Sequence, residues 1–411
     1  MRHRQEDLLA RRTIERTGSP PTPSPEGSRP PGAAATGPGP QLTLESTVPY
    51  LLRLGLLDLP SLVRHGLQIE EVPGRNRNFR VLGGPGQTFF LKQAPRGEIG
   101  TNGPLAVEAS LYQWVAADAG AAGLRPVFPR RRHYDPERSI LVLDLVTEAA
   151  HPYVLEDEAS PAYLVALRRL VAAALAECHG LPARLGVASG AALAQTAPWV
   201  FDLARPAPAS LIELAPAQLK VIQAVQSQPG AVAALDRLRD EWLPTGLIHG
   251  DFKWNNVLVQ EDSAGIPVRV LLLDWEMAQL GDAAWDVGAA LHALITEAVL
   301  GLDPTDGTGP EAAAGLLGAV IPRLLPAHRD FWSCYLAAAR LPDAEAGAFL
   351  DRLPGHVAAR LLKSAYEWSQ AEVRMPRSAA AILQLGINML LGPDEAREVV
   401  LGLGRRGSVR A

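Results

Sequence analysis

The sequence predicts an α+β fold with a small N-terminal lobe built on an antiparallel sheet and a larger, mostly helical C-terminal lobe. Strand-like runs cluster between residues 67 and 92, and Ala/Leu-rich amphipathic patterns dominate from residue 161 onward. Only two short apolar runs interrupt the helical patterns. A chain of 411 residues can bury a substantial core and usually forms two lobes or domains.

The first 42 residues are predicted to be a disordered, Pro-rich tail. Residues 18–40 contain eight prolines and almost nothing apolar beyond alanine, so they cannot bury enough surface to offset the entropy of ordering. Residues 405–411 are predicted to be a flexible C-terminal tail.

Residues 43–147 predict the small lobe, with the element order β-β-β-α-β after a short helix over 48–57. Pro104 stands in the favoured first-turn position of the helix that follows the third strand. Gly83, Gly84, Pro85 and Gly86 predict the turn between the second and third strands. The strands are expected at 67–72, 78–82, 88–92 and 140–146.

Residues 148–404 predict the helical lobe. Two apolar runs within it, 245–249 and 268–274, are typical of buried strands. Amphipathic helical patterns are found at 161–179, 216–242, 311–325, 331–341, 356–373 and 378–391.

Composition argues against several kinds of partner. A net charge of −5 and a pI near 6.0 give no reason to expect nucleic acid or an anionic membrane. The two cysteines, Cys178 and Cys334, cannot form a disulfide framework and suit a reducing cytosol, so a cytoplasmic location is expected. Neither a membrane span nor a secretory signal peptide is expected.

Polar residues with the chemistry of phosphoryl transfer follow the two apolar runs. Asp251 and Asn256 lie in HGDFKWNN, and Asp274 ends the run LLLD. A hydroxyl group that attacks a phosphate needs a carboxylate to orient it and accept its proton. Mg²⁺ takes oxygen ligands and shares them with the phosphates. We interpret Asp251 as the base and Asn256 and Asp274 as metal ligands.

A lysine and a glutamate in the small lobe complete this set. Lys92 ends the strand TFFLK, where it can bind the α- and β-phosphates, and Glu108 on the next helix can pair with it. Taken alone, Lys92 would be a surface lysine at a strand end, Glu108 a solvated helix residue, and each Asp a turn former or helix cap. Their order, each on the element that the mechanism requires, favours the joint interpretation.

The segments HGDFKWNNVLV, LLLDWEMA and GDAAWDVG resemble the catalytic, metal-binding and following segments of the aminoglycoside phosphotransferase/choline kinase superfamily, relatives of protein kinases. The resemblance spans roughly residues 45–395 and implies a bilobal protein-kinase-like fold that binds ATP and Mg²⁺ between its lobes. It also implies that the backbone of Asp144–Val146 meets the adenine and that Asp286 braces the catalytic loop. Whether Asp286 and Glu276 are catalytic or structural stays open.

The loop expected to cover the phosphates departs from a Gly-rich pattern. It reads Gly74-Arg75-Asn76-Arg77-Asn78 and contains no G-x-G-x-x-G. Backbone N–H groups together with Asn76 and Asn78 can still cover phosphates. The two arginines could equally be surface charges on a hairpin.

Three observations bear on the acceptor. Residues 301–411 carry twelve acidic and twelve basic residues, which argues against a polycationic acceptor. Lys253, two places after Asp251, can neutralise charge on the transferring phosphoryl group, and its type at this position is typical of Ser/Thr protein kinases. Residues 198–226 are similar to phosphotransferases of class V lanthipeptide and thioamide-peptide pathways. That likeness implies a Ser/Thr acceptor in a ribosomal precursor peptide and a partner lyase.

Two alternatives stay open at this stage. The acceptor could instead be the hydroxyl of an aminoglycoside, another antibiotic or a metabolite. The chain could also be a pseudokinase-like module that binds without turnover, although Lys92, Asp251, Asn256 and Asp274 are all present.

Overall fold

The computed structural model describes residues 41–98, 103–155, 158–181, 193–301 and 310–404. The predicted C-terminal tail and all but the last two residues of the predicted N-terminal tail lie outside the described residues. Leu42 is fully buried, and its backbone N–H donates to Gln93 Oε1 at 2.7 Å.

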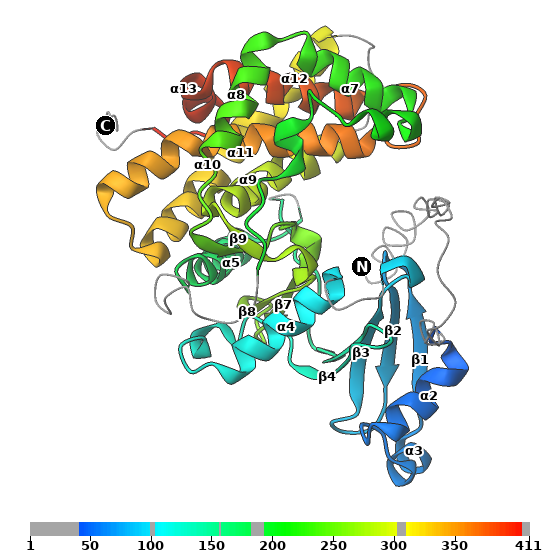
Figure 1. Cartoon of the computed structure of the whole chain (residues 1–411). Coiled ribbons are helices and arrows are strands. Elements are labelled where there is room, and N and C mark those ends of the chain that lie inside the picture. The colour runs from blue at the N-terminus through cyan, green and yellow to red at the C-terminus, as the bar shows by residue number, and fades with distance from the viewer. Residues whose placement is uncertain (1–40, 99–102, 156–157, 182–192, 302–309, 405–411) are drawn as a thin grey trace. The chain divides into compact units, whose positions relative to one another are not determined.

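The N-terminal part is a five-stranded antiparallel sheet in the order β1-β2-β3-β5-β4 (Figure 1). Strand β4 was not predicted from the sequence, because RRHYD has no apolar alternation. Backbone pairing with β5 holds this strand in the sheet. The other strands are confirmed to within two residues. The strands are β1 (Gln68–Val72), β2 (Arg77–Leu82), β3 (Thr88–Gln93), β4 (Arg131–Asp135) and β5 (Ile140–Asp144).

Helix α2 (Leu44–Arg53) covers one face of this sheet and begins four residues earlier than predicted. Thr43 and Ser46 form a capping box, in which Ser46 N–H donates to Thr43 Oγ1 at 3.2 Å and Thr43 N–H donates to Ser46 Oγ at 2.7 Å. The helix buries Tyr50 and Leu51 in a small core with sheet side chains such as Phe79. Helix α3 (Leu59–His65) follows.

Helix α4 (Pro104–Ala117), confirmed at its predicted start, contacts both the sheet and the second half of the chain. Leu111, Tyr112 and Val115 belong to the same large hydrophobic core as the C-terminal helices. This helix therefore joins the sheet to the helical part.

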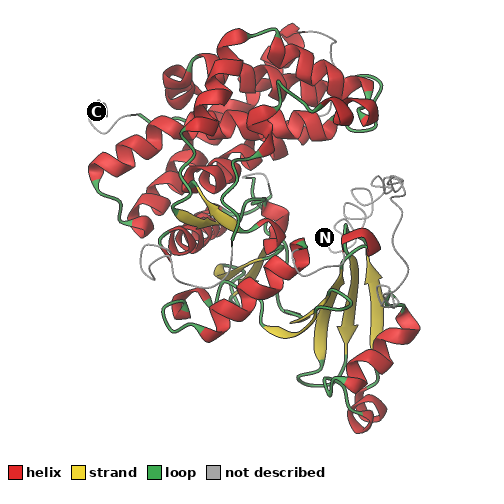
Figure 2. Cartoon of the chain, in the orientation of Figure 1, coloured by secondary structure: helices red, strands yellow, loops and turns green. Residues whose placement is uncertain are grey.

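The C-terminal part is helical apart from two short strand pairs, which confirms the predicted α+β class (Figure 2). The predicted bounds of three helical segments are wrong, and in each case the error lies at a proline. Pro229 divides 216–242 into two helices, whereas α10 and α11 continue through Pro326 and Pro354 and are longer than predicted. The helices are α5 (Pro161–His179), α7 (Pro216–Gln226), α8 (Pro229–Asp240), α9 (Ala283–Leu300), α10 (Pro310–Ala339), α11 (Asp343–Trp368), α12 (Arg377–Leu391) and α13 (Pro393–Glu395).

Both strand pairs lie beside the motifs noted in the sequence. Strand β6 (Gly246–Ile248) pairs with β9 (Gln279–Gly281), and β7 (Val257–Glu261) pairs with β8 (Pro267–Leu272). The H-G-D stretch connects β6 to β7, and Asp274 lies between β8 and β9. The two connections are therefore held next to each other at one end of both pairs.

Helix α9, which the sequence patterns did not predict, is long and apolar enough to cross a membrane, with a mean hydropathy of 1.3. However, 78% of that window is buried inside the protein. Core helices pass the same test of length and composition, so this helix is weak evidence for a membrane span.

An aromatic stack runs from α4 to the catalytic loop. Trp275 is fully buried, with its ring stacked on Phe128 at a centroid distance of 4.5 Å and tilted against the ring of His249 at 4.7 Å. Phe128 in turn meets Tyr112 of α4 edge-on at 5.7 Å. Trp275 thus connects the helix that carries Glu108 with the loop that carries Asp251.

Replacing Trp275 by alanine should lower the free energy of unfolding by about 3–5 kcal/mol, because a large buried ring and its contacts are lost. Urea denaturation of the purified protein measures this value. Trp199→Ala is the matched control, since that side chain is 47% exposed. An equal loss in both variants would contradict the role assigned to Trp275.

Candidate active site

Lys92 lies at the centre of an ion-pair group made by three separate elements. Its Nζ donates to Glu108 Oε1 at 2.8 Å and Oε2 at 2.9 Å, and it also contacts Asp274 Oδ1. Tyr112, one turn after Glu108, donates its hydroxyl to Glu108 Oε1 at 2.8 Å. Strand β3, helix α4 and the turn after β8 therefore meet at one ammonium group, as predicted for Lys92 and Glu108.

Burial by itself would lower the pKa of Lys92, but Glu108 and Asp274 outweigh it and the net pKa is raised. Lys92 is 5% exposed and Glu108 fully buried, so neither group has solvent as an alternative partner. Removing one partner of a buried ion pair leaves an uncompensated buried charge, which is strongly destabilising. The three groups are therefore held together.

Asp274 and Asn256 present oxygen atoms from adjacent turns. Asp274 adopts a left-handed backbone conformation (φ +59°) at the start of a short 3₁₀ turn, and its side chain is 49% exposed. Its contact with Lys92 uses Oδ1. Asn256 donates Nδ2 to Asp251 O at 3.2 Å, and its backbone carbonyl accepts from Leu273 N–H at 2.8 Å. These two contacts do not use the amide Oδ1 of Asn256, so this oxygen is the atom of the side chain that could bind a metal ion.

These two side chains fit a magnesium ion shared with a nucleotide. Mg²⁺ is usually held through one or two carboxylates plus phosphate oxygens and waters, not by a cage made wholly of protein ligands. Within the described residues there is no cluster of three or more His, Cys, Asp or Glu side chains suited to hold a metal. The Asp274 carboxylate and the Asn256 amide oxygen, on neighbouring turns, could supply the few protein ligands that a magnesium ion shared with phosphates needs.

Asp286 braces the backbone of the H-G-D loop. Its fully buried carboxylate accepts from His249 N–H at 2.5 Å and from Gly250 N–H at 3.1 Å. His179 Nε2 lies 3.5 Å from the same carboxylate. Burial alone would raise the pKa of Asp286, but the His179 and His249 contacts lower it further than burial raises it. These contacts give Asp286 a structural position on the loop backbone.

Gly250 is required at its position by conformation and by space. Its φ is +78°, and a Cβ there would lie 2.3 Å from Met277 O. His249 packs behind the loop, with Nε2 2.7 Å from Leu273 O, where it serves as a buried hydrogen-bonding residue.

Two residues from distant helices hold the loop carbonyls, and the sequence patterns did not single them out. Arg360 on α11 is 3% exposed and donates Nη2 to Phe252 O at 2.6 Å. Trp285 on α9 donates Nε1 to Gly250 O at 2.9 Å, and the Arg360 guanidinium lies 4.7 Å from its ring centroid. The only sequence signal was the GDAAWDVG segment, which contains Trp285.

Asp251 is surrounded by positive charge. Lys253 Nζ lies 3.1 Å from its Oδ2, and Lys363 Nζ of α11 lies 3.4 Å from its Oδ1. Burial would raise the pKa of Asp251, but Lys253, Lys363 and Arg360 together hold it well below its usual range. Lys253 also lowers the pKa of Asp274, after the larger contribution of Lys92. Lys253 therefore lowers the pKa of both carboxylates. Lys363 was not predicted from the sequence.

The loop between β1 and β2 reaches the turn after Asp274. Arg75 donates to Glu276 Oε1 at 2.9 Å and to Glu98 Oε2 at 2.9 Å, and Asn76 Nδ2 lies 3.3 Å from Glu276 Oε2. Arg75 is therefore more than a hairpin surface charge. Asn78 lies in β2 directly opposite Lys92, and its buried Oδ1 has no hydrogen-bond partner among the described residues.

The predicted hinge lies at the end of β5. The Asp144 N–H donates to Arg130 O at 2.9 Å, and its side chain pairs with Arg132. Leu145 N–H donates to Thr88 O at 3.1 Å. Among the hinge residues named above, the N–H groups of Asp144 and Leu145 are therefore engaged, which leaves the Val146 N–H as the donor that could meet a base.

Replacing Asp286 by asparagine should lower the free energy of unfolding near neutral pH by about 1–3 kcal/mol, because an amide can accept for only part of the loop contacts. The folded-state pKa of Asp286 lies below its ordinary 3.8, so its stabilisation is present above about pH 4 and is lost as the pH falls further. The difference in free energy of unfolding between Asp286→Asn and wild type should therefore become smaller at low pH.

Urea denaturation at about pH 7 and about pH 3.5 tests this expectation. The control is Asp240→Asn, since Asp240 is exposed on α8 and its ion-pair partner among the described residues is Arg239, at 3.1 Å. A difference for Asp286→Asn that stays constant across this pH range would contradict the charge-based account.

Comparison with solved structures finds similar folds. The structure is similar to a choline kinase from Cryptosporidium parvum Iowa II, with a TM-score of 0.51 and 11% identity over 89% of this chain and 99% of that chain. It also matches choline kinase LicA from Streptococcus pneumoniae (TM-score 0.45, 16% identity, 84% and 99% covered). A third match is the macrolide 2'-phosphotransferase MphH from Brachybacterium faecium (0.41, 16%, 85% and 99%). Among curated proteins, none matches the sequence significantly.

The sequence itself supplies the family. Residues 68–320, more than half of the chain, match the family described as the phosphotransferase enzyme family. This range contains β1 to β9, Lys92 and Asp251, whereas Arg360 and Lys363 lie beyond it. The protein is a member of the phosphotransferase enzyme family and has a protein-kinase-like fold.

Proposed function

We propose that the protein uses ATP and Mg²⁺ and transfers the γ-phosphoryl group to a Ser or Thr hydroxyl of a peptide in the cytoplasm. The observation that carries this proposal is the convergence of Lys92, Asp251, Asn256 and Asp274 from three separate segments on one site. Sites of phosphoryl transfer work mainly by positioning and by electrostatic stabilisation, and such a convergence supplies both.

The nucleotide half of the site has a role for each group. Lys92, held by Glu108, binds the α- and β-phosphates. Asn76 from the loop between β1 and β2, and Asn78 from β2, cover these phosphates. The backbone of Asp144 and Val146 meets the adenine. Mg²⁺, when bound through Asp274 and Asn256, would neutralise charge on the phosphates.

In the acceptor half, Asp251 orients the hydroxyl. Its lowered pKa keeps it ionised, so it accepts a hydrogen bond from the hydroxyl throughout the physiological pH range. Lys253, between Asp251 and Asp274, meets charge that develops on the transferring phosphoryl group. Asp286 and Arg360 keep the loop in place without touching the reacting atoms.

The charge around Asp251 supports an acceptor that is not a cation. Two lysines and a buried arginine act on this carboxylate, and a polycationic aminoglycoside or a quaternary amine would be repelled there. A peptide serine or threonine is neutral and fits this environment. If the peptide is a ribosomal precursor, the phosphorylated residue is the substrate that a partner lyase would need for elimination of phosphate.

Incubation with Mg²⁺ and γ-labelled ATP tests the reaction against Ser/Thr peptides, choline, an aminoglycoside and a macrolide. We expect label on the peptides, with Asp251→Asn reducing transfer by about 10²–10⁴-fold while ATP affinity changes little. Asp240→Asn is the exposed-site control. Label on the cationic small molecules alone would contradict the peptide acceptor, and near-normal turnover of Asp251→Asn would contradict its assignment as the base.

Replacing Asp274 by alanine should weaken Mg²⁺-dependent ATP binding by about 10- to 100-fold, because the carboxylate ligand is lost. Titration calorimetry with ATP, with and without Mg²⁺, separates the metal contribution from the contribution of Lys92. An unchanged difference between the two titrations would show that Asp274 does not hold the metal. Asp240→Ala should bind as wild type does.

A further inference from the structure

Both oxygens of Asp251 are occupied by ammonium groups from different parts of the chain. Lys253, on the loop itself, contacts Oδ2, and Lys363, from α11, contacts Oδ1. A hydroxyl that donates a hydrogen bond to Asp251 must share an oxygen with one of them. Because Lys253 also faces Asp274 on the nucleotide side, Lys363 is the group that an incoming acceptor meets.

Helix stabilisation does not account for the position of Lys363. It pairs with Glu367 at 2.7 Å, but a lysine that precedes a glutamate by four residues is the weaker orientation of such a pair. The Lys363 side chain is 18% exposed and the Glu367 side chain 41%, so the ammonium group lies at the buried end of the pair. Lys253 and Arg360 already favour the ionised form of Asp251.

An aromatic pair continues from Lys363 along the same face of α11. Tyr366 lies three residues after Lys363, and its ring meets that of Trp199 at a centroid distance of 5.1 Å. Trp199 is 47% exposed and opens the segment 198–226 that the sequence singled out. The partly exposed indole offers apolar contact area, and Lys363, one turn before Tyr366 on α11, adds a charge.

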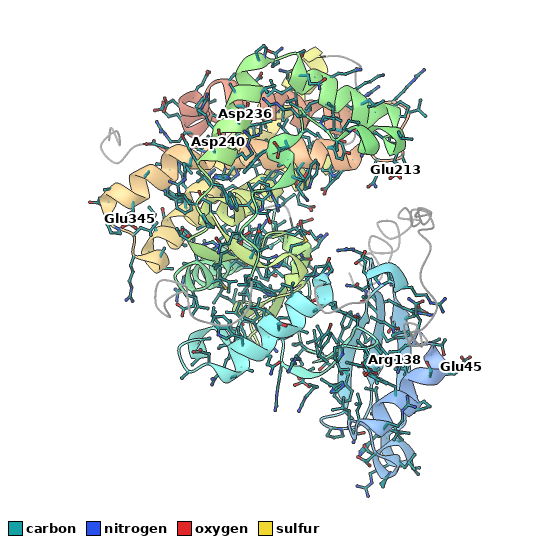
Figure 3. The ribbon with its side chains drawn as sticks, in the orientation of Figure 1. Glu45, Arg138, Glu213, Asp236, Asp240 and Glu345 are labelled. Atoms are coloured by element: carbon teal, nitrogen blue, oxygen red, sulfur yellow. The ribbon has the colours of Figure 1, made fainter. Side chains whose placement is uncertain are left out.

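Ion pairs to α8 hold the Trp199 segment in place. Asp202 accepts from Arg239 Nη1 at 2.8 Å, and Arg205 makes two contacts with Asp236, of 2.6 and 2.7 Å. Asp236 is labelled on α8 in Figure 3. The aromatic pair therefore belongs to the folded framework around the acceptor side.

We propose that Lys363 recognises a carboxylate on the acceptor peptide, carried by a residue adjacent to the phosphorylated Ser or Thr, and that the Trp199–Tyr366 pair packs against the following side chain. This rests on the proposed function. The hydroxyl takes over Asp251 Oδ1, and the Lys363 ammonium, 3.4 Å from that oxygen, turns to the substrate carboxylate. Neighbouring residues of a peptide lie about 3.8 Å apart at Cα, so one short segment can carry both the hydroxyl and the carboxylate. The preferred acceptor is an acidic peptide.

Two pairs of pentapeptides test the subsite. Within each pair, the central residue is flanked by glutamate in one peptide and by glutamine in the other; the centre is serine in the first pair and alanine in the second. The alanine peptides cannot accept phosphate, so their affinities, measured by calorimetry with ADP and Mg²⁺ present, do not depend on turnover. Wild type should bind the glutamate peptide about 10- to 100-fold more tightly, and added salt should reduce this preference.

Substitutions separate recognition from catalysis. Lys363→Ala should abolish the preference in both affinity and kcat/KM, Lys363→Arg should retain it, and Lys363→Glu should favour peptides flanked by lysine. Lys253→Ala should lower turnover of both serine peptides and keep the preference. Equal wild-type affinity for the two alanine peptides, or a preference that survives in Lys363→Ala, would overturn the proposal. A preference in binding without phosphate transfer would instead contradict only the proposed function.

Discussion

The ion-pair group at Lys92 is the interaction on which the rest of the site depends. A buried ammonium group cannot remain without partners, and here its partners come from helix α4 and from the turn after β8. The sheet, the helix and the turn that carries Asp274 are therefore held in one geometry. The aromatic stack of Tyr112, Phe128 and Trp275 runs beside this group to His249, so packing and charge connect the same elements.

The acceptor side follows a different physical principle. In the proposed function, Asp251 is the base, and its surroundings favour the charged form so strongly that its main contribution is orientation of the hydroxyl. On the same proposal, the excess positive charge at this point selects against cationic acceptors. The family supplies the phosphotransferase chemistry, and we propose that the lysines placed by this chain determine which acceptors can approach.

Much of the fold could be predicted because local patterns agree with the tertiary structure. Strands β1, β2 and β3 alternate or run apolar, and α4 begins at a proline in its favoured position. The failures have a common cause. Strand β4 is polar and exists because β5 pairs with it, and α10 and α11 pass through prolines because packing of their faces outweighs the local cost.

The sequence by itself indicated which groups to propose for phosphoryl transfer, because Asp251, Asn256 and Asp274 lie in short segments whose spacing is imposed by two tight turns. It also indicated Lys92 and Glu108 from their elements. Only the tertiary structure decided what surrounds Asp251. Arg360 and Lys363 follow it by more than one hundred residues, on a helix whose local pattern shows nothing unusual, and they act through charge at a distance that only folding sets. Electrostatic effects depend on separation in space, and separation along the chain does not reveal it.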